Sequence, residues 1–391
     1  MQKSKFINPN EYGSLFYDEK EKEYLNNVVD EHRIFRYAKS NYSYTYMCED
    51  YISKMINVNH TLMVTNGTSG LKTALVGAGV MSDDRVLISS YTFLATALAA
   101  IAIKAVPVPI DVDLETGLNV DDLKREIEKG CKAIIVVHFQ GRAFDLTEVK
   151  KIAKANNIVL IEDACQAFGA KYHNQFAGTF GDIGVYSFQQ FKQISCGEGG
   201  AVVTNNPEYY ERMRNYTDMG SIRDRYPSWN DERVLFGENY RMNNLNAAVL
   251  YAQLEKFAMI IKRQEKSRTN IMQQLAEYKI KNILESKDPN GDTAMNILII
   301  LNNSKDKEKV INLGLEQNIE LRNMWSSLYY DNDLFRKNYL TAIDLKNREC
   351  MHTKELIEKM LVISIPPILN ETTERQLANF ILKLKNENYM E

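Results

Sequence analysis

The sequence has no long hydrophobic run and no recognisable export signal. Its most apolar stretch, FLATALAAIAI at residues 93–103, is too short to cross a bilayer and is followed by Lys104. The first residues, MQKSKFINPNEYG, contain no apolar segment of the kind found in signal peptides. We therefore expect a soluble protein of the cytoplasm that does not bind a membrane.

Cysteine is scarce and charge is balanced. The lysines and arginines number 48 and the aspartates and glutamates 51, which leaves a formal net charge of −3. Nucleic-acid-binding domains carry a basic excess instead, so we expect no nucleic-acid partner. No CxxC pair and no metal-ligand spacing occurs among the five cysteines, at positions 48, 131, 165, 196 and 350. Reduced thiols and no metal site are the expected consequence.

The composition is that of an ordinary folded protein, without internal repeats or low-complexity segments. Of 391 residues, 45% are hydrophobic and 25% are charged. Short β-branched runs predict strands, and the stretches between them have the apolar spacing of helices. The predicted strands are 61–67, 85–90, 106–113, 133–139, 158–164 and 185–188, and the predicted helices between them are 69–79, 92–105, 120–130 and 146–157. This alternation predicts an α/β fold with a mainly parallel sheet flanked by helices.

The pattern changes near residue 244. Residues 245–278 have apolar side chains every three or four positions and predict one long helix. A strand at 296–303 and helices at 305–318 and 371–386 are predicted after it. The length of the chain favours two domains. We expect a large domain over residues 1–250 and a smaller C-terminal α+β domain over 251–391, joined by the long helix.

Three polar groups follow predicted strands, at the edge of a parallel sheet where ligands bind. Asn66–Gly67 and two hydroxyl residues open a helix, where backbone N–H groups can bind an anion. Asp163 belongs to an acidic pair that closes a strand, and Lys192 precedes a glycine-rich turn. Each also has an ordinary interpretation taken alone: helix N-caps for the first two, and a solvated surface charge for the lysine.

Taken together, the three groups match pyridoxal phosphate chemistry. A lysine forms a Schiff base with the aldehyde of that cofactor, and a carboxylate pairs with the pyridinium nitrogen. The phosphate binds at a helix N-terminus. A flat aromatic side chain is expected over the ring, and Phe93 follows the next strand. Ordinary core packing is the alternative interpretation of Phe93.

Several blocks of the sequence resemble the DegT/StrS family of sugar aminotransferases, which have the fold of aspartate aminotransferase (fold type I). The resemblance covers nearly the whole chain. It is carried by NGTSGL (66–71), YTFLATALA (91–99), VVHFQGRAFDL (136–146), IEDACQAFGA (161–170), GTFGDIGVYSFQQFKQISCGEGGAVVTNN (178–206), GENYRMNNLNAAVLYAQL (237–254) and VISIPP (362–367).

The resemblance implies catalytic roles for two residues and cofactor contacts for two more. Lys192 is similar to the family's Schiff-base lysine, and Asp163 to the carboxylate on the pyridinium nitrogen. Gln166 stands where the family has His or Gln near the ring oxygen. Phe93 stands where the family has an aromatic residue that stacks on the ring.

The resemblance also implies a phosphate site shared between two subunits. Thr68 and Ser69 resemble the phosphate-binding backbone positions, and Ser187 resembles the phosphate-binding hydroxyl. Asn239 is similar to an asparagine that reaches the phosphate from the neighbouring subunit. We therefore expect a homodimer with composite active sites.

The implied activity is transfer of an amino group from glutamate or glutamine to a keto sugar, either nucleotide-linked or a keto-cyclitol. SFQQ before the lysine and GEGG after it favour the cyclitol class. Segment 321–332 lacks the histidine that many nucleotide-sugar members have there, and Phe191 replaces a commonly small residue. Segment 223–234 is a candidate substrate loop.

Three alternatives stay open at this stage. A sugar dehydratase of the same family has histidine in place of the lysine, so Lys192 argues against it. A non-catalytic binding protein is disfavoured because Lys192 and Asp163 are both present. A cyclising synthase that uses the same cofactor is a minor enzyme alternative.

Overall fold

The computed structural model describes most of the chain. The described residues are 12–37, 43–220, 235–324, 328–331, 333, 335, 337 and 348–391.

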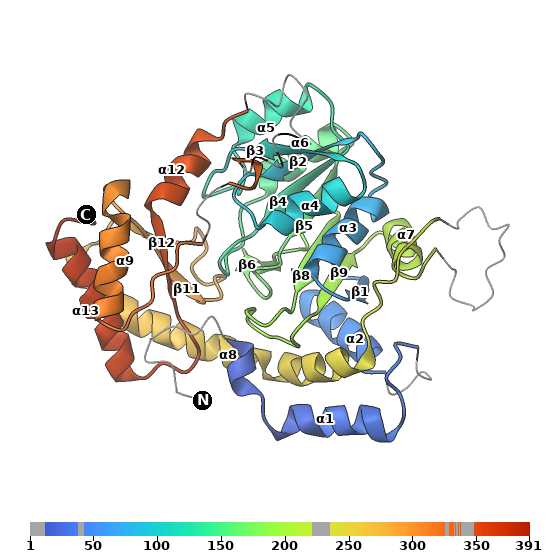
Figure 1. Ribbon diagram of the computed structural model, residues 1–391, viewed down its shortest axis with the longest axis horizontal. Helices are drawn as coiled ribbons and strands as arrows, with labels where there is room; N and C mark the ends of the chain where they lie inside the picture. Colours follow the sequence, from blue (N-terminus) through green and yellow to red (C-terminus); the bar gives the residue numbers. More distant parts are fainter. Residues whose placement is uncertain are drawn as a thin grey trace.

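A seven-stranded sheet forms the centre of the molecule, in the order β1-β9-β8-β5-β4-β2-β3 (Figure 1). All of its strands are parallel except β9, which pairs antiparallel with both neighbours. The strands are β1 (His60–Val64), β2 (Arg85–Ser89), β3 (Val106–Ile110), β4 (Ala133–Val137), β5 (Val159–Asp163), β8 (Ile183–Ser187) and β9 (Gly200–Thr204). The predicted α/β class with a mainly parallel sheet is therefore confirmed, and all six predicted strands are present. The sequence analysis missed β9.

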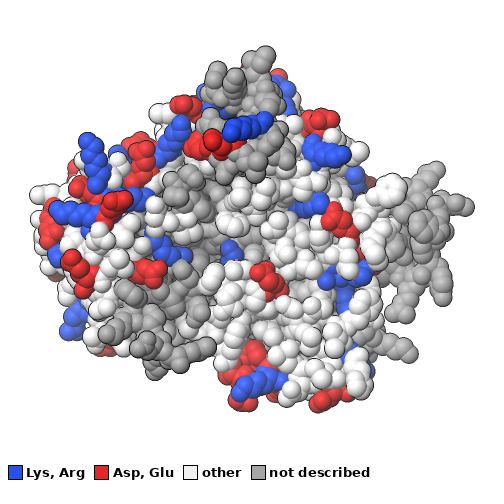
Figure 2. All heavy atoms as spheres, in the orientation of Figure 1, with Lys and Arg blue, Asp and Glu red and all other residues white. Residues whose placement is uncertain are grey.

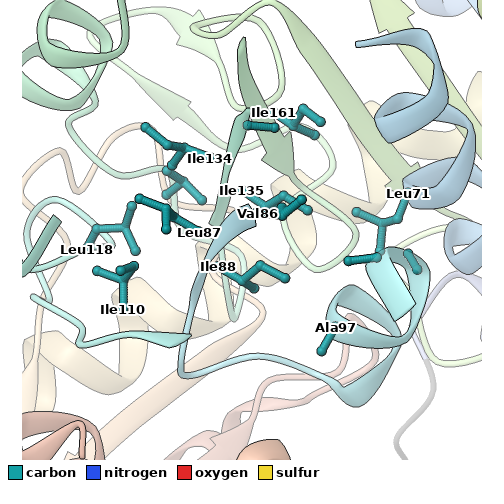
Figure 3. Packing of buried hydrophobic residues seen from close by; sticks show 14 of the residues in the cluster. Leu71, Val86, Leu87, Ile88, Ala97, Ile110, Leu118, Ile134, Ile135 and Ile161 are labelled. Atoms are coloured by element: carbon teal, nitrogen blue, oxygen red, sulfur yellow. The ribbon is translucent and has the colours of Figure 1, made fainter. Parts of the chain in front are cut away.

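Helices alternate with the strands, close to the predicted ranges. They are α3 (Gly67–Gly77), α4 (Leu94–Ala102), α5 (Val120–Ile127) and α6 (Thr147–Ala155), and a further helix, α7 (Pro207–Thr217), was not predicted. Figure 3 shows the core beneath them, where Leu71 of α3 faces Val86 and Ile135 of the sheet and Ala97 of α4 lies nearest to Ile88. Burial of this apolar surface is the main stabilising contribution to the sheet–helix layers.

The two faces of the sheet have separate cores because side chains alternate along each strand. Leu62 and Val64 of β1 belong to the cluster under α3, whereas Met63 belongs to the cluster on the opposite face. The opposite face is covered by α2 (Tyr44–Ile56) and the first half of α8 (Asn244–Leu275). Helix α1 (Glu19–Asp30) packs along α8 outside this layer (Figure 1).

The C-terminal part forms an antiparallel sheet, β10-β11-β12, with a core of its own. Helix α13 packs against the second half of α8. The strands are β10 (Ile283–Leu284), β11 (Asn296–Ile300) and β12 (Met360–Ser364), and the helices are α9 (Lys307–Glu316), α12 (Met351–Lys359) and α13 (Glu371–Asn386). The predicted boundary after residue 250 falls inside α8, and the division into two domains stays a prediction.

Short elements complete the described part. A hairpin is formed by β6 (Lys171–Tyr172) and β7 (Gln175–Phe176), and the 3-10 helices are η1 (Gly13–Phe16), η2 (Ala276–Tyr278), η3 (Ser304–Asp306) and η4 (Tyr329–Asp331). On the face drawn in Figure 2, acidic and basic side chains are interspersed. Within the described ranges, no helix has the length and apolarity needed to span a membrane.

Candidate active site

A cavity lies at the carboxyl ends of the parallel strands, where the sequence predicted the ligand edge. It is lined by Gln166, which follows β5, by Ser187, which ends β8, and by Lys192. The remaining lining residues are Cys165, Phe168, Gln193, Ile194 and Met295. The structure thus brings three of the predicted site residues, from two strand ends, around one cavity.

Lys192 lies in the turn that connects β8 to β9. Its backbone N–H donates to the carbonyl of Gln189 at 2.9 Å, which fixes the turn. Burial of the side chain lowers the pKa of its ammonium group, and the nearby Arg322 guanidinium lowers it further. Asp163 and Cys165 oppose these effects. The net result favours the neutral amine, which is the nucleophilic form.

Asp163 ends β5 with its carboxylate held by two donors. The Thr96 hydroxyl of α4 donates to Oδ2 at 2.7 Å, and the Cys165 N–H donates to Oδ1 at 3.1 Å. The residue is only 5% exposed. An ionised carboxylate has about four acceptor positions, so these two bonds leave capacity for another donor. Asp163 is therefore an oriented, buried acceptor whose charge acts on Lys192.

The neighbouring carboxylate, Glu162, points to the opposite face of the sheet and has a structural role. It accepts from His138 Nε2 at 2.8 Å and from the N–H groups of Gly178 and Gly181. His138 Nδ1 accepts from the Phe144 N–H at 3.1 Å, so the imidazole proton is on Nε2. Strand alternation thus separates the acidic pair into one structural residue and one residue at the ligand edge.

The start of α3 is a capping box rather than a pair of free hydroxyls. Asn66 Oδ1 accepts from the Ser69 N–H at 2.8 Å, and Ser69 Oγ accepts from the Asn66 N–H at 3.2 Å. The Ser69 hydroxyl also bonds the Thr65 hydroxyl, while Thr68 is exposed. Because the first N–H groups of a helix lack intrahelical partners, those of Gly67 and Thr68 are left to bind an anion.

Glycine at position 67 lets this helix start approach the cavity. A Cβ there would lie 2.9 Å from Cys165 Sγ and 3.0 Å from Ser187 Cβ. Gly200 of β9 likewise faces the Asn66 backbone, which a Cβ would meet at 2.5 Å. The two glycines explain how the helix start, the Ser187 hydroxyl and the turn that carries Lys192 come together.

The residues present fit pyridoxal phosphate. The cavity offers an amine of lowered pKa for the aldehyde and the Ser187 hydroxyl for the phosphate, and the N-terminus of α3 lies next to Ser187. The buried carboxylate of Asp163 lies within the electrostatic reach of that amine. The aldehyde, the phosphate and the ring nitrogen of the cofactor therefore each have a chemically suitable partner.

The remaining predicted residues lie farther from the cavity wall. Phe93 precedes α4 and is 60% exposed, so the alternative of ordinary core packing is wrong. Asn239 is exposed and pairs with Asp218 in an isolated antiparallel β-bridge. Its Oδ1 accepts from the Arg241 N–H at 3.4 Å. The structure does not bring Asn239 to the cavity of its own chain, and its role in a neighbouring subunit stays a prediction. Segment 223–234 lies outside the described residues.

Four residues near the cavity were missed by the sequence analysis. Thr96 binds Asp163, and Gln140 binds Gln166. Asn296 and Arg322 reach this region from the C-terminal part. Thr92, just before α4, and Thr96, within it, are four positions apart and bond to each other at 2.7 Å, so this contact is local in sequence. The contacts of the other three join distant segments and had no local signal.

Comparison with known proteins agrees with this geometry. The profile of the DegT/DnrJ/EryC1/StrS aminotransferase family matches residues 17–382. GDP-perosamine synthase of Escherichia coli O157:H7 is 34% identical over 309 residues, 78% of this chain and 81% of that protein. L-glutamine:2-deoxy-scyllo-inosose aminotransferase of Streptomyces kanamyceticus is 38% identical over 204 residues, 50% of this chain and 48% of that protein.

Solved structures show the same fold. The ntda protein of Bacillus subtilis, solved with bound cofactor PMP, has a TM-score of 0.81 and 20% identity, and the match covers 94% of this chain and 82% of that one. The solved structure confirms the predicted fold, and the family profile confirms the predicted enzyme class and its pyridoxal phosphate cofactor. With the family profile matching from residue 17 to residue 382, the chain belongs to the DegT/DnrJ/EryC1/StrS aminotransferase family.

Proposed function

We propose that this aminotransferase of amino sugar biosynthesis takes the amino group of glutamate or glutamine and delivers it to the keto group of a sugar or cyclitol. The observation that carries the proposal is the cavity at the sheet edge, where Lys192, Gln166 and Ser187 meet beside Asp163. The two relatives described above act, by their names, on a nucleotide-linked sugar and on a keto-cyclitol. Both substrate classes therefore belong to the proposal.

Each protein group has a distinct task in this chemistry. Pyridoxal phosphate, when bound, supplies an aldehyde that links to amines and a ring that accepts electron density. The Gly67 and Thr68 N–H groups and the Ser187 hydroxyl bind its phosphate. Asp163 faces the ring nitrogen and keeps it protonated, and Gln166 donates to the ring oxygen.

Lys192 is the proposed general acid–base. Its Nζ takes the proton from the α-carbon of the amino donor and later returns a proton to the carbon that carried the keto group. The pKa of Lys192, lowered chiefly by burial, increases the fraction of neutral amine available for the first transfer. Arg322 reinforces this effect electrostatically.

We also propose a homodimer in which Asn239 completes the neighbouring site. Large apolar side chains are exposed at the start of α4 and near Asn239, and a cluster of such side chains is typical of an interaction surface. They include Phe93, Leu94 and Leu98 near α4, and Phe35, Met219 and Phe236 near the Asn239 segment. A subunit interface over these residues removes them from water and places Asn239 against a second chain.

The substrate class is tested by half-reactions. The purified protein is converted to its pyridoxamine phosphate form, and nucleotide-linked keto sugars and keto-cyclitols are screened for return of the pyridoxal absorbance. Glutamate and glutamine are then compared as donors in the opposite half-reaction. If neither substrate class restores the pyridoxal absorbance, the proposal is contradicted. The candidate substrate loop, 223–234, lies outside the described residues, so the assay decides between the two classes.

A cytoplasmic location is part of the proposal. All five cysteines are free thiols, and free thiols are typical of a reducing compartment. Cell fractionation with a tagged protein tests this directly.

A further inference from the structure

A chain of three side-chain amides leads from Arg322 to the cavity. Arg322 Nη2 donates to Asn296 Oδ1 at 2.7 Å, and Asn296 Nδ2 donates to Gln140 Oε1 at 2.7 Å. Gln140 Nε2 then donates to Gln166 Oε1 at 3.2 Å. Asn296 belongs to β11 and Gln140 follows β4, so the chain links the C-terminal sheet to the central one.

The direction of every bond in this chain is set by its first member. A guanidinium group only donates, so Asn296 must present its oxygen to Arg322. The Tyr12 hydroxyl also donates to that oxygen, at 3.1 Å. The Asn296 nitrogen therefore faces Gln140, and the Gln140 nitrogen faces Gln166. The last amide is left with its oxygen occupied and its N–H donors available to the cavity.

The backbone around Gln140 is built to hold this arrangement. Gln140 is 3% exposed and has φ 57°, a left-handed conformation that is costly for a residue other than glycine. The next residue, Gly141, donates its N–H to the Gln166 carbonyl at 2.9 Å and accepts from the Thr293 N–H at 3.0 Å. A Cβ at Gly141 would lie 2.2 Å from Thr293 Oγ1. Backbone hydrogen bonds to Gln166 and to Thr293 thus hold the loop that carries Gln140.

We infer that Gln140, Asn296 and Arg322 are positioning residues that fix the Gln166 amide with its N–H donors directed at the ring oxygen of the cofactor. This inference rests on the proposed function, because Gln166 is placed at the ring oxygen there. A hydrogen-bond donor at the ring oxygen stabilises the negative charge of that oxygen. The oxygen then holds less tightly the proton that it shares with Nζ of Lys192 when the lysine is joined to the cofactor. The amide chain thereby makes the cofactor linkage easier to deprotonate.

Two variants of Gln140 test the inference. Gln140→Glu keeps the acceptor for Asn296 but has no donor for Gln166, so the Gln166 amide is free to turn its oxygen to the cavity. Gln140→Met removes the donor without adding charge. Gln189→Glu is the matched control, because it adds the same charge in the turn that carries Lys192 and keeps the acceptor for the Phe191 N–H. The titratable and charged groups near Lys192, namely Asp163, Cys165, Arg322 and Glu198, are unchanged in all three.

The readouts are the affinity of the apoprotein for pyridoxal phosphate and the pH midpoint of the bound cofactor's absorbance change. Both Gln140 variants are expected to weaken binding about tenfold and to raise the midpoint by roughly one unit. Gln189→Glu is expected to change neither by a comparable amount.

The outcomes separate this inference from the proposed function. Wild-type protein that fails to hold the cofactor at Lys192 overturns the proposed function itself. Wild-type protein that holds it, with both Gln140 variants unchanged in midpoint and affinity, overturns the role of the amide chain alone. Circular dichroism and thermal melting confirm that each variant is folded, and if one Gln140 variant fails to fold, the other decides.

Discussion

The hydroxyl of Thr96 donates a hydrogen bond to the carboxylate of Asp163, with 2.7 Å between Oγ1 and Oδ2. Thr92 lies four residues earlier, just before α4, and its hydroxyl bonds the Thr96 hydroxyl at 2.7 Å. Because the ionised carboxylate only accepts, Thr96 donates to Asp163, and Thr92 donates to Thr96. The carboxylate at the proposed ring-nitrogen position is thus held by a short relay of hydroxyl groups.

Replacing Thr96 by valine keeps the shape of the side chain and removes this donor. We expect the turnover number to fall about tenfold, since a hydrogen bond to a charged group contributes roughly 1.5–3 kcal/mol. Thr73→Val is the matched control, because the Thr73 hydroxyl is buried without a hydrogen-bond partner among the described residues. Equal rates for Thr96→Val and wild type would show that Asp163 needs no support from α4.

Gly67→Ala tests the close approach of α3 to the cavity. The added methyl group would lie within 3.0 Å of Ser187 Cβ and closer still to Cys165 Sγ, so the helix start must move. We expect the affinity for pyridoxal phosphate to fall roughly tenfold, the usual scale of overpacking. Titration of the apoprotein measures it. Gly77→Ala, at the other end of the same helix, makes a still closer contact with the buried Met213 side chain, so it is the matched overpacking control and should leave the affinity unchanged.

The lowered pKa of Lys192 predicts the pH dependence of its reactivity. Burial disfavours the ammonium form, so the amine becomes neutral at a lower pH than the ordinary value of 10.5. Only the neutral amine reacts in reductive methylation. In the apoprotein, modification of Lys192 should therefore reach half its maximum below pH 10.5, as followed by mass spectrometry of the peptide. A midpoint at or above that value is the opposite result.

Glu162 and Asp163 are adjacent in sequence and are predicted to differ in mutational effect. In Glu162→Gln one acceptor oxygen becomes a donor and opposes the N–H of Gly178 or Gly181. We expect the free energy of unfolding to fall by about 1–3 kcal/mol while the cofactor still links to Lys192. Urea denaturation measures the free energy of unfolding, and the absorbance of the bound cofactor shows whether it is linked to Lys192.

The control for that variant is an exposed glutamate. Glu115 lies 2.6 Å from Lys287 on the surface, where an ion pair contributes little. Glu115→Gln should change the free energy of unfolding by less than about 1 kcal/mol. If Glu162→Gln lowers the free energy of unfolding no more than Glu115→Gln does, the structural role of Glu162 is contradicted.

The sequence predicted the layered fold well because hydrophobic period and strand length are local properties. The buried runs of β4 and β5 and the whole of α13 were found at or within a few residues of their bounds. Strand β9 was missed because it begins at Gly200, after a glycine-rich turn, and its apolar residues 201–203 are too few to show a period. Its place beside β1 is a matter of tertiary pairing.

The candidate site was predictable only in part, because only local features leave a pattern in the sequence. Lys192 and Asp163 follow strands, and the carboxyl ends of parallel strands share an edge. The bond from Asn296 to Gln140 spans 156 positions, and no local pattern records it. The Ser69 N–H and hydroxyl are both used by the capping box, which the sequence did not separate from a phosphate site, and the backbone contact of Ser69 with the phosphate stays a prediction.

The central claim is that Lys192 is the residue that holds the cofactor. Borohydride reduction of the purified protein with bound pyridoxal phosphate, followed by peptide mapping, tests it most directly. We predict a single labelled peptide that contains Lys192, and loss of the label in Lys192→Ala. A label on another lysine, or none in protein that has been saturated with pyridoxal phosphate, would contradict the account.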